Sequence, residues 1–336
     1  MVKTRRADRI PFFDNLKFKL TVLVVLGHFI QGYRSGSEFY RSLYLMIYAF
    51  HMPLFLFISG QFHSNYRVKV RVLALLAIGF AMKIAMYLVP LTLEGSAPDF
   101  QLFSGSSIYW YVFVLAYYSM ASYCFRDIDR GFLLIMSVVL ACFAGYDSGV
   151  GDEFYLSRAI TFYPFYVLGE AMDKDEVIEV SKAIPLKLIA LLILGAWGAA
   201  CFLFYDRVGF LQPLFLGRYP YSVDENILRF GWMYRLLCYV ITILTGLSVL
   251  ALTSRDRFVF VTRAGNRTLQ AYFWHTPLLQ IMSHYHVPEF FFALPWGEWQ
   301  WLGVAVLLTF LLSFRIFGFP VNIIIHYCRY EDEYDL

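Results

Sequence analysis

The sequence predicts an all-α polytopic membrane protein, a helical bundle with about ten transmembrane helices. Three observations lead to this fold class. Hydrophobic residues make up 59% of the 336 residues and charged residues only 16%, whereas a soluble domain carries about 25% charged residues. Apolar runs long enough to cross a bilayer recur along the whole chain. Lysine and arginine gather in alternate loops between these runs, as they do in multi-pass membrane proteins.

The expected spans are mainly apolar runs close to the length of about 20 residues that a bilayer requires. They are residues 16–33, 39–62, 68–91, 106–124, 131–146, 157–172, 184–205, 231–253, 268–286 and 299–327. The last is long, and we expect a kink near Gly318 or Pro320. No segment resembles an appended soluble domain, so residues 1–336 are expected to form one membrane domain.

The distribution of basic residues predicts the orientation in the membrane. The N-terminus and alternate loops are basic, with Arg5, Arg71, Arg130, Lys174 and Arg263 among their residues. The opposite stretches 92–105 and 284–298 contain no lysine or arginine, although 206–230 contains three arginines. Because basic loops stay in the cytoplasm, we expect a multi-pass protein of the plasma membrane with both termini cytoplasmic.

Several function classes are disfavoured by composition. The five cysteines show no recurring short spacing, so neither a disulfide framework nor a metal site is expected. The basic residues are scattered among loops, which argues against nucleic-acid binding. The first apolar run follows a basic segment without a cleavage signal, so it is interpreted as a retained helix.

Ionisable residues inside the expected spans are the main functional signal. The first span begins with Asp14 and Lys17, and His28 follows eleven residues after Lys17, roughly 16 Å further along a helix. His51 and His275 fall within the second and ninth spans. Lys83, Arg235 and Arg315 are further cations in spans, and Glu170 lies near the end of the sixth. Ionisable groups in a bilayer are costly and mark functional sites by default.

The excess of cationic groups over carboxylates indicates an anionic ligand, such as a phosphate-bearing donor that enters from the cytoplasm. Arg67 and Arg71 follow the second span, and on a helix they would share a face suited to binding phosphate. Their alternative role is ordinary cytoplasmic charge. For Lys83, Arg235 and Arg315 the alternative is pairing with backbone carbonyls or snorkelling.

Two roles are possible for His28, one catalytic and one structural. A neutral imidazole takes a proton from a hydroxyl near pH 7, whereas a structural histidine would hydrogen-bond between helices. His275 is equally compatible with both roles. His51-Met52-Pro53 is expected to break the second span, because proline lacks a backbone donor. Ser59-Gly60 is read mainly as a close helix contact, and Asn266 as a cap for the ninth span.

Four blocks together resemble the acyltransferase 3 family, and most closely its fucose 4-O-acetylase-like and polysaccharide-adhesin modification branch. The blocks are Phe13-Asp14-Asn15-Leu16-Lys17, Val24-Val25-Leu26-Gly27-His28, the run from Phe50 to Gly60, and the run from Gly265 to Tyr272 with His275. The resemblance covers essentially the whole chain.

The resemblance implies roles for individual residues. His28 would be the catalytic base or proton relay, and Arg67 and Arg71 would engage an acyl-CoA donor. Lys17 stands at a basic position that is often arginine in relatives. Asp14, His51, Ser59, Gly60 and His275 would support the site.

The function that follows is O-acylation of a carbohydrate or cell-surface glycan with an acetyl or similar short acyl group. Acetyl-CoA or another acyl-CoA would be the co-substrate, and no permanently bound cofactor or metal is expected. Polysaccharide-synthesis proteins are candidate partners besides the bilayer. The rival reading is a transporter or flippase for a glycan or lipid-linked sugar, and a third is a membrane-embedded partner of a polysaccharide synthase.

Overall fold

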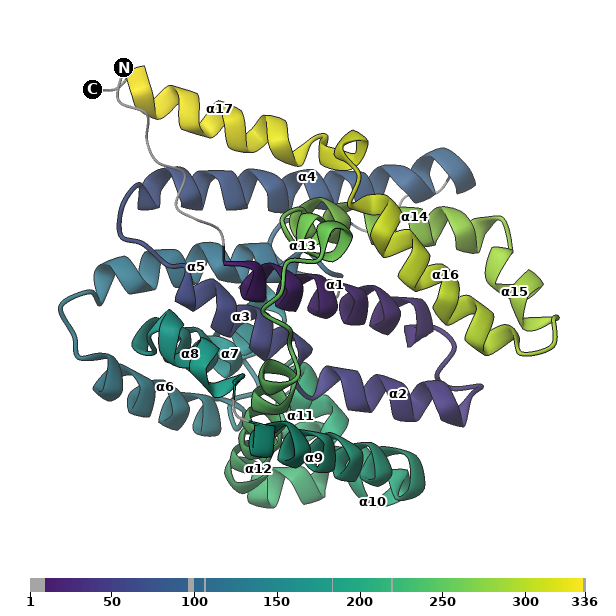
Figure 1. Ribbon diagram of the computed structural model, residues 1–336, viewed down its shortest axis with the longest axis horizontal. Helices are drawn as coiled ribbons and strands as arrows, with labels where there is room; N and C mark the ends of the chain where they lie inside the picture. The colour runs from purple at the N-terminus through teal and green to yellow at the C-terminus, as the bar shows by residue number, and fades with distance from the viewer. Residues whose placement is uncertain (1–9, 96–99, 106, 183, 219, 335–336) are drawn as a thin grey trace.

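The computed structural model describes residues 10–95, 100–105, 107–182, 184–218 and 220–334, and the secondary structure of these residues is helical without strands. The predicted all-α helical bundle is confirmed (Figure 1). The α-helices are α1 Pro11–Gln31, α2 Glu38–Tyr48, α3 His51–Gln61, α4 Val68–Glu94, α5 Trp110–Cys124, α6 Arg130–Ala144, α7 Leu156–Ala171, α8 Lys174–Val180, α9 Ile184–Leu203, α10 Tyr205–Val208, α11 Gln212–Leu216, α12 Glu225–Ala251, α13 Val259–Gly265, α14 Thr268–His284, α15 Val287–Phe292, α16 Gly297–Leu312 and α17 Val321–Tyr334. Four short 3₁₀ turns, η1 Glu153–Tyr155, η2 Gly209–Leu211, η3 Tyr221–Val223 and η4 Arg315–Gly318, lie between them.

The expected spans coincide with helices, but not all are long and apolar enough to cross a membrane by themselves. In the described part of the chain, four helical segments meet that standard: Glu38–Gln61, Val68–Glu94, Leu186–Leu203 and Ile227–Ala251. The apolar helices α6 and α16 are shorter. The remaining expected spans form α1, α5, α7 and α14, which are shorter or carry more polar residues.

The second expected span is broken into α2 and α3, as predicted, at Ala49 and Phe50. Pro53 has no backbone N–H, so it leaves the carbonyl of Ala49, four residues earlier, without its helical donor. The Thr242 hydroxyl, from α12, donates to that carbonyl oxygen at 2.6 Å. The break leaves a buried carbonyl without its helical hydrogen bond, and a side chain of a neighbouring helix supplies the missing donor.

Replacing Thr242 with valine is expected to lower stability by about 1–3 kcal/mol, because the Ala49 carbonyl would then be buried without a donor. The matched control is Thr245→Val. Its hydroxyl donates to the Ile241 carbonyl within its own helix, so its loss costs less. Thermal unfolding in detergent compares the two, and equal midpoints would contradict the assignment.

The last expected span is two helices rather than one kinked helix. α16 ends at Leu312 and α17 begins at Val321, with η4 between them. α17 packs along α4 at the edge of the bundle (Figure 1). The sequence suggested that Arg315 lies inside a span. The structure instead places it on the exposed turn η4.

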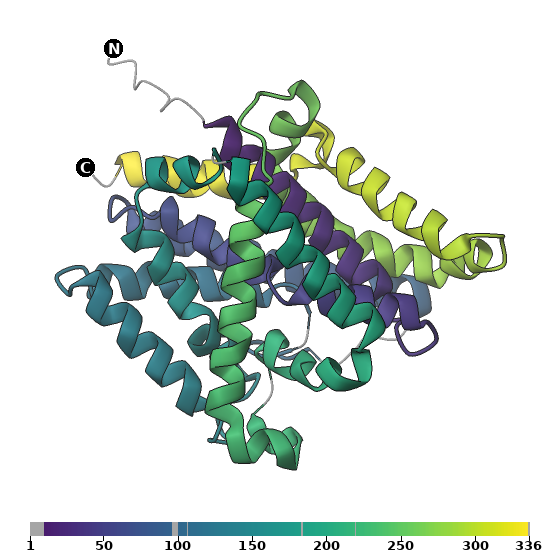
Figure 2. The ribbon, with the colours of Figure 1, turned by 60° about the horizontal axis from the view of Figure 1, so that its bottom comes forward.

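α1 is the central helix of the bundle and packs against α2, α3, α13, α14 and α16 (Figures 1 and 2). Asn15, near its start, fixes it to the loop before α13. The Asn15 side-chain amide donates to the carbonyls of Ser254 and Asp256 at 3.0 and 2.8 Å, and its Oδ1 accepts from the Thr262 hydroxyl at 2.8 Å. This buried network sets the position of the α1 side chains that follow.

α3 and α7 touch through their backbones at two glycines. A Cβ on Gly60 would lie 2.1 Å from the Tyr166 carbonyl oxygen, and one on Gly169 would lie 2.1 Å from the Phe57 carbonyl oxygen. The reading of Gly60 as a close helix contact agrees with this geometry.

Two cations inside the bundle have structural partners. Lys83 donates to the carbonyls of Gln101 and Ser104 at 2.6 and 2.8 Å. Arg235 donates to the carbonyl of Leu214, in the middle of α11, at 2.5 Å. Both side chains therefore form hydrogen bonds with backbone carbonyls, which was the alternative interpretation of these residues.

Candidate active site

One face of α1 lines two separate cavities. Asp14, Lys17 and Thr21 line the first, and Val24, His28 and Gln31 line the second. Successive members of this series are three or four residues apart, so all six project from the same side of the helix. The cavities therefore follow one another along α1, from its N-terminal to its C-terminal end.

The first cavity is large, about 810 Å³, and its lining contains more cations than carboxylates. Its charged lining residues in the described chain are Lys17, Arg71, Lys174 and Asp14. The ammonium groups of Lys17 and Lys174 lie 4.5 and 4.6 Å from the centre of the Phe62 ring. Asp14 lies 3.9 Å from Lys17. Three cations against one carboxylate make this cavity suited to a polyanion.

Arg67 and Arg71 do not occupy equivalent positions. Arg67 precedes α4 with a left-handed backbone (φ 54°), so the two residues do not share a helix face as the sequence suggested. Its guanidinium lies 5.2 Å from the centre of the Tyr66 ring, and it is not among the described residues that line the large cavity. Arg71 lines the cavity and donates to the Ser64 carbonyl at 2.9 Å.

Ser59 and Gly60 have different roles although they are adjacent. Ser59 lines the large cavity, and its hydroxyl donates to the Phe55 carbonyl at 2.9 Å and lies 3.1 Å from the Tyr111 hydroxyl. Gly60 instead makes the backbone contact with α7. One residue of the pair thus belongs to the site, and the other positions the helix that carries it.

The second cavity is narrow, about 90 Å³, and is lined by His28 and His51. His275 is fully buried behind His28, and the centres of their rings are 5.2 Å apart. Gln31 and the aromatic residues Tyr44, Tyr48 and Trp110 complete much of the wall. The structure thus brings the three predicted histidines into one cluster.

The hydrogen bonds of His51 and His275 fix the orientation of their rings. Nδ1 of His51 lies 2.9 Å from the Ile47 carbonyl oxygen, and Nδ1 of His275 lies 3.1 Å from that of Ala271. Because a carbonyl only accepts, Nδ1 carries the proton in each neutral ring and Nε2 is the acceptor. Nε2 of His275 is buried, and no residue in the described part of the chain forms a hydrogen bond with it. An acceptor nitrogen thus stands beside His28.

Tyr272 stands between the two cavities, because it lines both of them. Its hydroxyl donates a very short hydrogen bond to the Ile108 carbonyl, and its ring centre lies 5.4 Å from that of Tyr111 and 5.7 Å from that of His275. Only one aromatic side chain in the described structure is common to the two linings. The basic cavity and the histidine cavity are therefore immediate neighbours.

Three arginines in the histidine cavity were not among the predicted site residues: Arg34, Arg158 and Arg218. Arg158 stands at the start of the sixth expected span, and counting it as an ionisable residue in that span would have identified it. Arg34 and Arg218 come from loops, and nothing in their local sequence signals a site. Asn266, which was expected to cap α14, instead follows α13 and donates to the Thr262 carbonyl at 2.9 Å.

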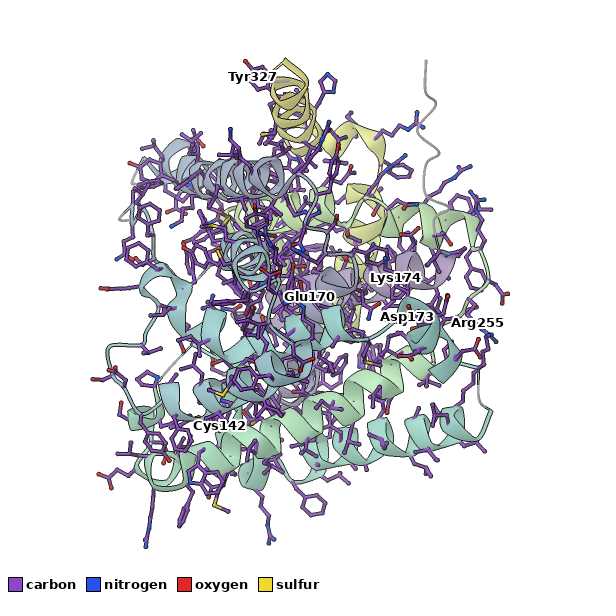
Figure 3. All side chains as sticks on the ribbon, turned by 90° about the vertical axis from the view of Figure 1, so that its left-hand side faces the viewer. Cys142, Glu170, Asp173, Lys174, Arg255 and Tyr327 are labelled. Atoms are coloured by element: carbon purple, nitrogen blue, oxygen red, sulfur yellow. The ribbon has the colours of Figure 1, made fainter. Side chains whose placement is uncertain are left out.

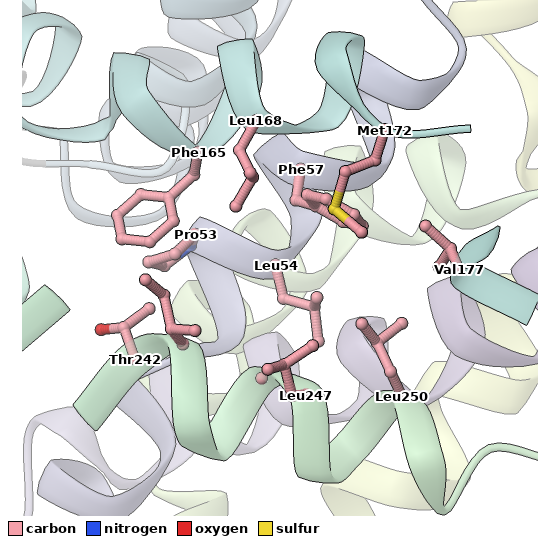
Figure 4. Close-up of a pocket in the computed structure, with 12 residues that line it drawn as sticks. Pro53, Leu54, Phe57, Phe165, Leu168, Met172, Val177, Thr242, Leu247 and Leu250 are labelled. Atoms are coloured by element: carbon pink, nitrogen blue, oxygen red, sulfur yellow. The ribbon is translucent and has the colours of Figure 1, made fainter. Parts of the chain in front are cut away.

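Two other pockets lack this chemistry. The pocket in Figure 4 lies between α3, α7 and α12, and its lining is apolar apart from Thr242. The other pocket contains Glu170, whose carboxylate lies 3.8 Å from His63 and 3.6 Å from Arg130. Asp173 and Lys174 follow toward the edge of the molecule (Figure 3). These contacts describe a buried charge cluster at the end of α7.

A family model described as an acyltransferase domain matches residues 10–318. The chain is also similar to the nodulation protein NolL of Sinorhizobium fredii (strain NBRC 101917 / NGR234), with 27% identity over 213 residues, which cover 58% of this chain and 56% of NolL. The match thus spans only about half the length of that relative. No solved structure matches the chain. With a family model that covers nearly all of its residues, the chain belongs to the acyltransferase 3 family of multi-pass membrane acyltransferases.

Proposed function

We propose that the protein is a membrane O-acyltransferase that moves an acetyl or other short acyl group from acyl-CoA to a hydroxyl of a carbohydrate or cell-surface glycan. The observation that carries the proposal is the adjacency of the two cavities at Tyr272, with Lys17 and His28 on the same face of α1. Acyl transfer from CoA requires a basic site that binds the phosphates of the donor. It also requires an adjacent base that deprotonates the acceptor hydroxyl, and the two cavities would supply these two functions.

The donor would occupy the large cavity. Its phosphates would be held by Arg71, Lys17 and Lys174, which line the cavity, since guanidinium and ammonium groups form charge-assisted hydrogen bonds with phosphate. The slender pantetheine arm would run along α1 toward Tyr272. Arg67 would act at the entrance rather than in the cavity.

We infer a direct transfer in which His28 acts as the base. His28 accepts the proton of the acceptor hydroxyl while its oxygen attacks the thioester carbonyl. The carbon–sulfur bond then breaks, and the CoA sulfur leaves and takes up the proton from His28. His51 and His275 support this exchange, because their rings are fixed by backbone carbonyls and His275 faces His28. Direct transfer needs no covalent acyl-enzyme.

The carbohydrate acceptor is supported by the resemblance to the fucose 4-O-acetylase-like branch and by the aromatic residues beside His28. Sugars expose apolar faces that pack on aromatic rings, and Tyr44, Tyr48 and Trp110 line that cavity. The cavity is narrow, with a volume of about 90 Å³, so it would hold the reacting end of the acceptor rather than a whole glycan. We place the protein in the plasma membrane with cytoplasmic termini, on the basis of the basic loops.

The proposal is tested by incubating the purified protein in detergent with acetyl-CoA labelled in the acetyl group and with cell-envelope glycans. An acyltransferase releases CoA and labels a glycan without any membrane barrier. A transporter or flippase needs sealed vesicles and leaves its cargo chemically unchanged. Failure to label any glycan fraction, together with uptake of unmodified glycan by vesicles, would favour the transporter.

Arg71→Gln is expected to raise KM for acyl-CoA about tenfold, with a smaller effect on kcat, because it removes one charge-assisted contact to the donor. Lys69→Gln is the matched control, since Lys69 is exposed on the same helix and is not among the described residues that line the cavity. Steady-state kinetics with varied acyl-CoA measure both. An unchanged KM in Arg71→Gln would remove this arginine from the donor site.

A further inference from the structure

The cavity around His28 has an excess of fixed positive charge that the transfer reaction does not use. Arg34, Arg158 and Arg218 line it together with His28 and His51. Among the described lining residues, none is aspartate or glutamate. The three arginines come from the loop after α1, the start of α7 and the loop after α11.

One carboxylate serves two of these arginines. Asp152 Oδ1 lies 3.4 Å from Nη2 of Arg158, and its Oδ2 accepts a very short hydrogen bond from Nε of Arg218. None of the ion pairs in the described structure involves Arg34, whose guanidinium lies 4.6 Å from the centre of the Tyr44 ring. Among the ion pairs of the described residues, Arg158 and Arg218 thus share one carboxylate and Arg34 has none.

The arginines also have unused donors. Arg158 is only 5% exposed, and its guanidinium lies 4.9 Å from the centre of the Trp110 ring. Nη1 of Arg158 and Nη1 of Arg34 are both buried and have no hydrogen-bond partner among the described residues. A buried charged donor without a partner is costly, because it has lost its water without gaining an acceptor.

An anion in the cavity would satisfy both deficits at once. Guanidinium groups offer paired N–H donors that match the oxygens of phosphate or carboxylate. Arg34 and Arg158 each offer an unused donor, and the oxygens of a phosphate or diphosphate group could accept from both. The anionic group would lie in the same cavity as the hydroxyl that His28 deprotonates, so both belong to one molecule.

We propose that the acceptor is a phosphorylated saccharide, and that its phosphate or diphosphate group is bound by Arg34, Arg158 and Arg218 while a sugar hydroxyl faces His28. This assignment rests on the proposed acyltransferase function, which it makes more specific. The diphosphate would come from a lipid carrier or from a nucleotide sugar. In either case the group that the site recognises is the same.

The experiment measures binding rather than catalysis, so that it is independent of acyl transfer. Isothermal titration of inorganic diphosphate into the purified protein is done in detergent at low salt with saturating CoA, which occupies the donor cavity. Wild-type protein is expected to bind diphosphate, and Arg158→Gln and Arg34→Gln are each expected to weaken binding about tenfold, as the loss of a charge-assisted contact predicts. His28→Ala is expected to keep the binding although it loses catalysis.

Two controls separate this site from other basic surfaces. Arg229→Gln changes an exposed arginine of α12, and Arg71→Gln changes the donor cavity; both are expected to leave the affinity unchanged. Arg158→Lys keeps the charge beside Asp152 and provides a folded variant if Arg158→Gln does not accumulate. Arg34→Gln provides a second one, since Arg34 has no ion-pair partner in the described chain.

Further ligands identify the source of the diphosphate. Tighter binding of geranyl diphosphate than of inorganic diphosphate indicates a lipid-linked sugar, and tighter binding of uridine diphosphate indicates a nucleotide sugar. Absence of binding by the wild type, or binding that survives in both Arg158→Gln and Arg34→Gln, would overturn the proposal. Binding of glucuronate without binding of diphosphate would also overturn it, because the acceptor would then carry a carboxylate.

Discussion

His28→Ala is expected to abolish detectable acyl transfer while the protein still inserts into the membrane and accumulates. A positioned general base contributes about 10²–10⁴-fold to a reaction rate, and the variant would leave the acceptor hydroxyl without its base. His28 lies at the cavity wall and is only partly buried, so its removal enlarges the cavity and leaves the packing of α1 intact. The measurement is transfer of labelled acetyl groups to glycan by equal amounts of folded protein.

The control for this variant is His284→Ala, which changes a histidine at the end of the same helix that carries His275. His284 lies 3.9 Å from Glu94 and is not among the described residues that line either cavity. Its activity is expected to remain near that of the wild type. Full activity in His28→Ala would remove the proposed base, and equal losses in both variants would indicate a general effect on folding.

Gly60→Ala is expected to cause the largest loss of stability among single substitutions discussed for this chain. The new Cβ would lie 2.1 Å from the carbonyl oxygen of Tyr166, and a backbone atom cannot rotate away as a side chain does. α3 and α7 would have to separate, at a cost toward or above the upper end of the about 1–3 kcal/mol typical of overpacking. Ser59 would move with α3, so the large cavity would also lose its shape.

Two other glycine-to-alanine substitutions are compared with Gly60→Ala, one expected to have the same effect and one expected to be neutral. Gly169→Ala should have the same effect, because its Cβ would lie 2.1 Å from the carbonyl oxygen of Phe57. Gly303→Ala should be neutral or slightly stabilising, since nothing lies within 4 Å of its added Cβ and alanine is the better helix former. Thermal unfolding in detergent ranks the three variants. Similar midpoints for Gly60→Ala and Gly303→Ala would contradict the close contact between α3 and α7.

Helix positions and the break in the second span were predictable because they depend on local sequence. Apolar run length places α4, α9 and α12, and the missing N–H of Pro53 accounts for the break. The division of the last span was only partly predictable. α17 is amphipathic and packs on α4. The position of this second half of the expected span is therefore determined by tertiary contacts and not by hydrophobicity alone.

The candidate site was predictable where its residues share one helix. Lys17 and His28 belong to one helix, and their spacing alone predicts that both side chains project from the same side of α1. Arg34 and Arg158 could not be joined to His28 in this way, because they lie on different segments and meet only in the folded bundle. Arg67 was misplaced because a helical backbone was assumed where the chain is left-handed.

The Phe13-to-Lys17 block also shows why a motif does not report roles by itself. Asn15 is buried in a network with Ser254 and Thr262, whereas Asp14 and Lys17 line the large cavity. Residues one or two positions apart on a helix face different surroundings. One block therefore contains both the anchor of α1 and part of the basic entrance.

The ring of Tyr272 has an electrical consequence as well as a chemical one. A cell keeps a voltage across its membrane, and each elementary charge that crosses 100 mV releases about 2.3 kcal/mol. Two cavities that meet at one residue thin the insulating layer to the side chains left between them. In this protein Tyr272, tethered through its hydroxyl to Ile108, belongs to that remaining layer. The residue that stands between the two cavities is thus also expected to keep protons and salt from leaking through the protein.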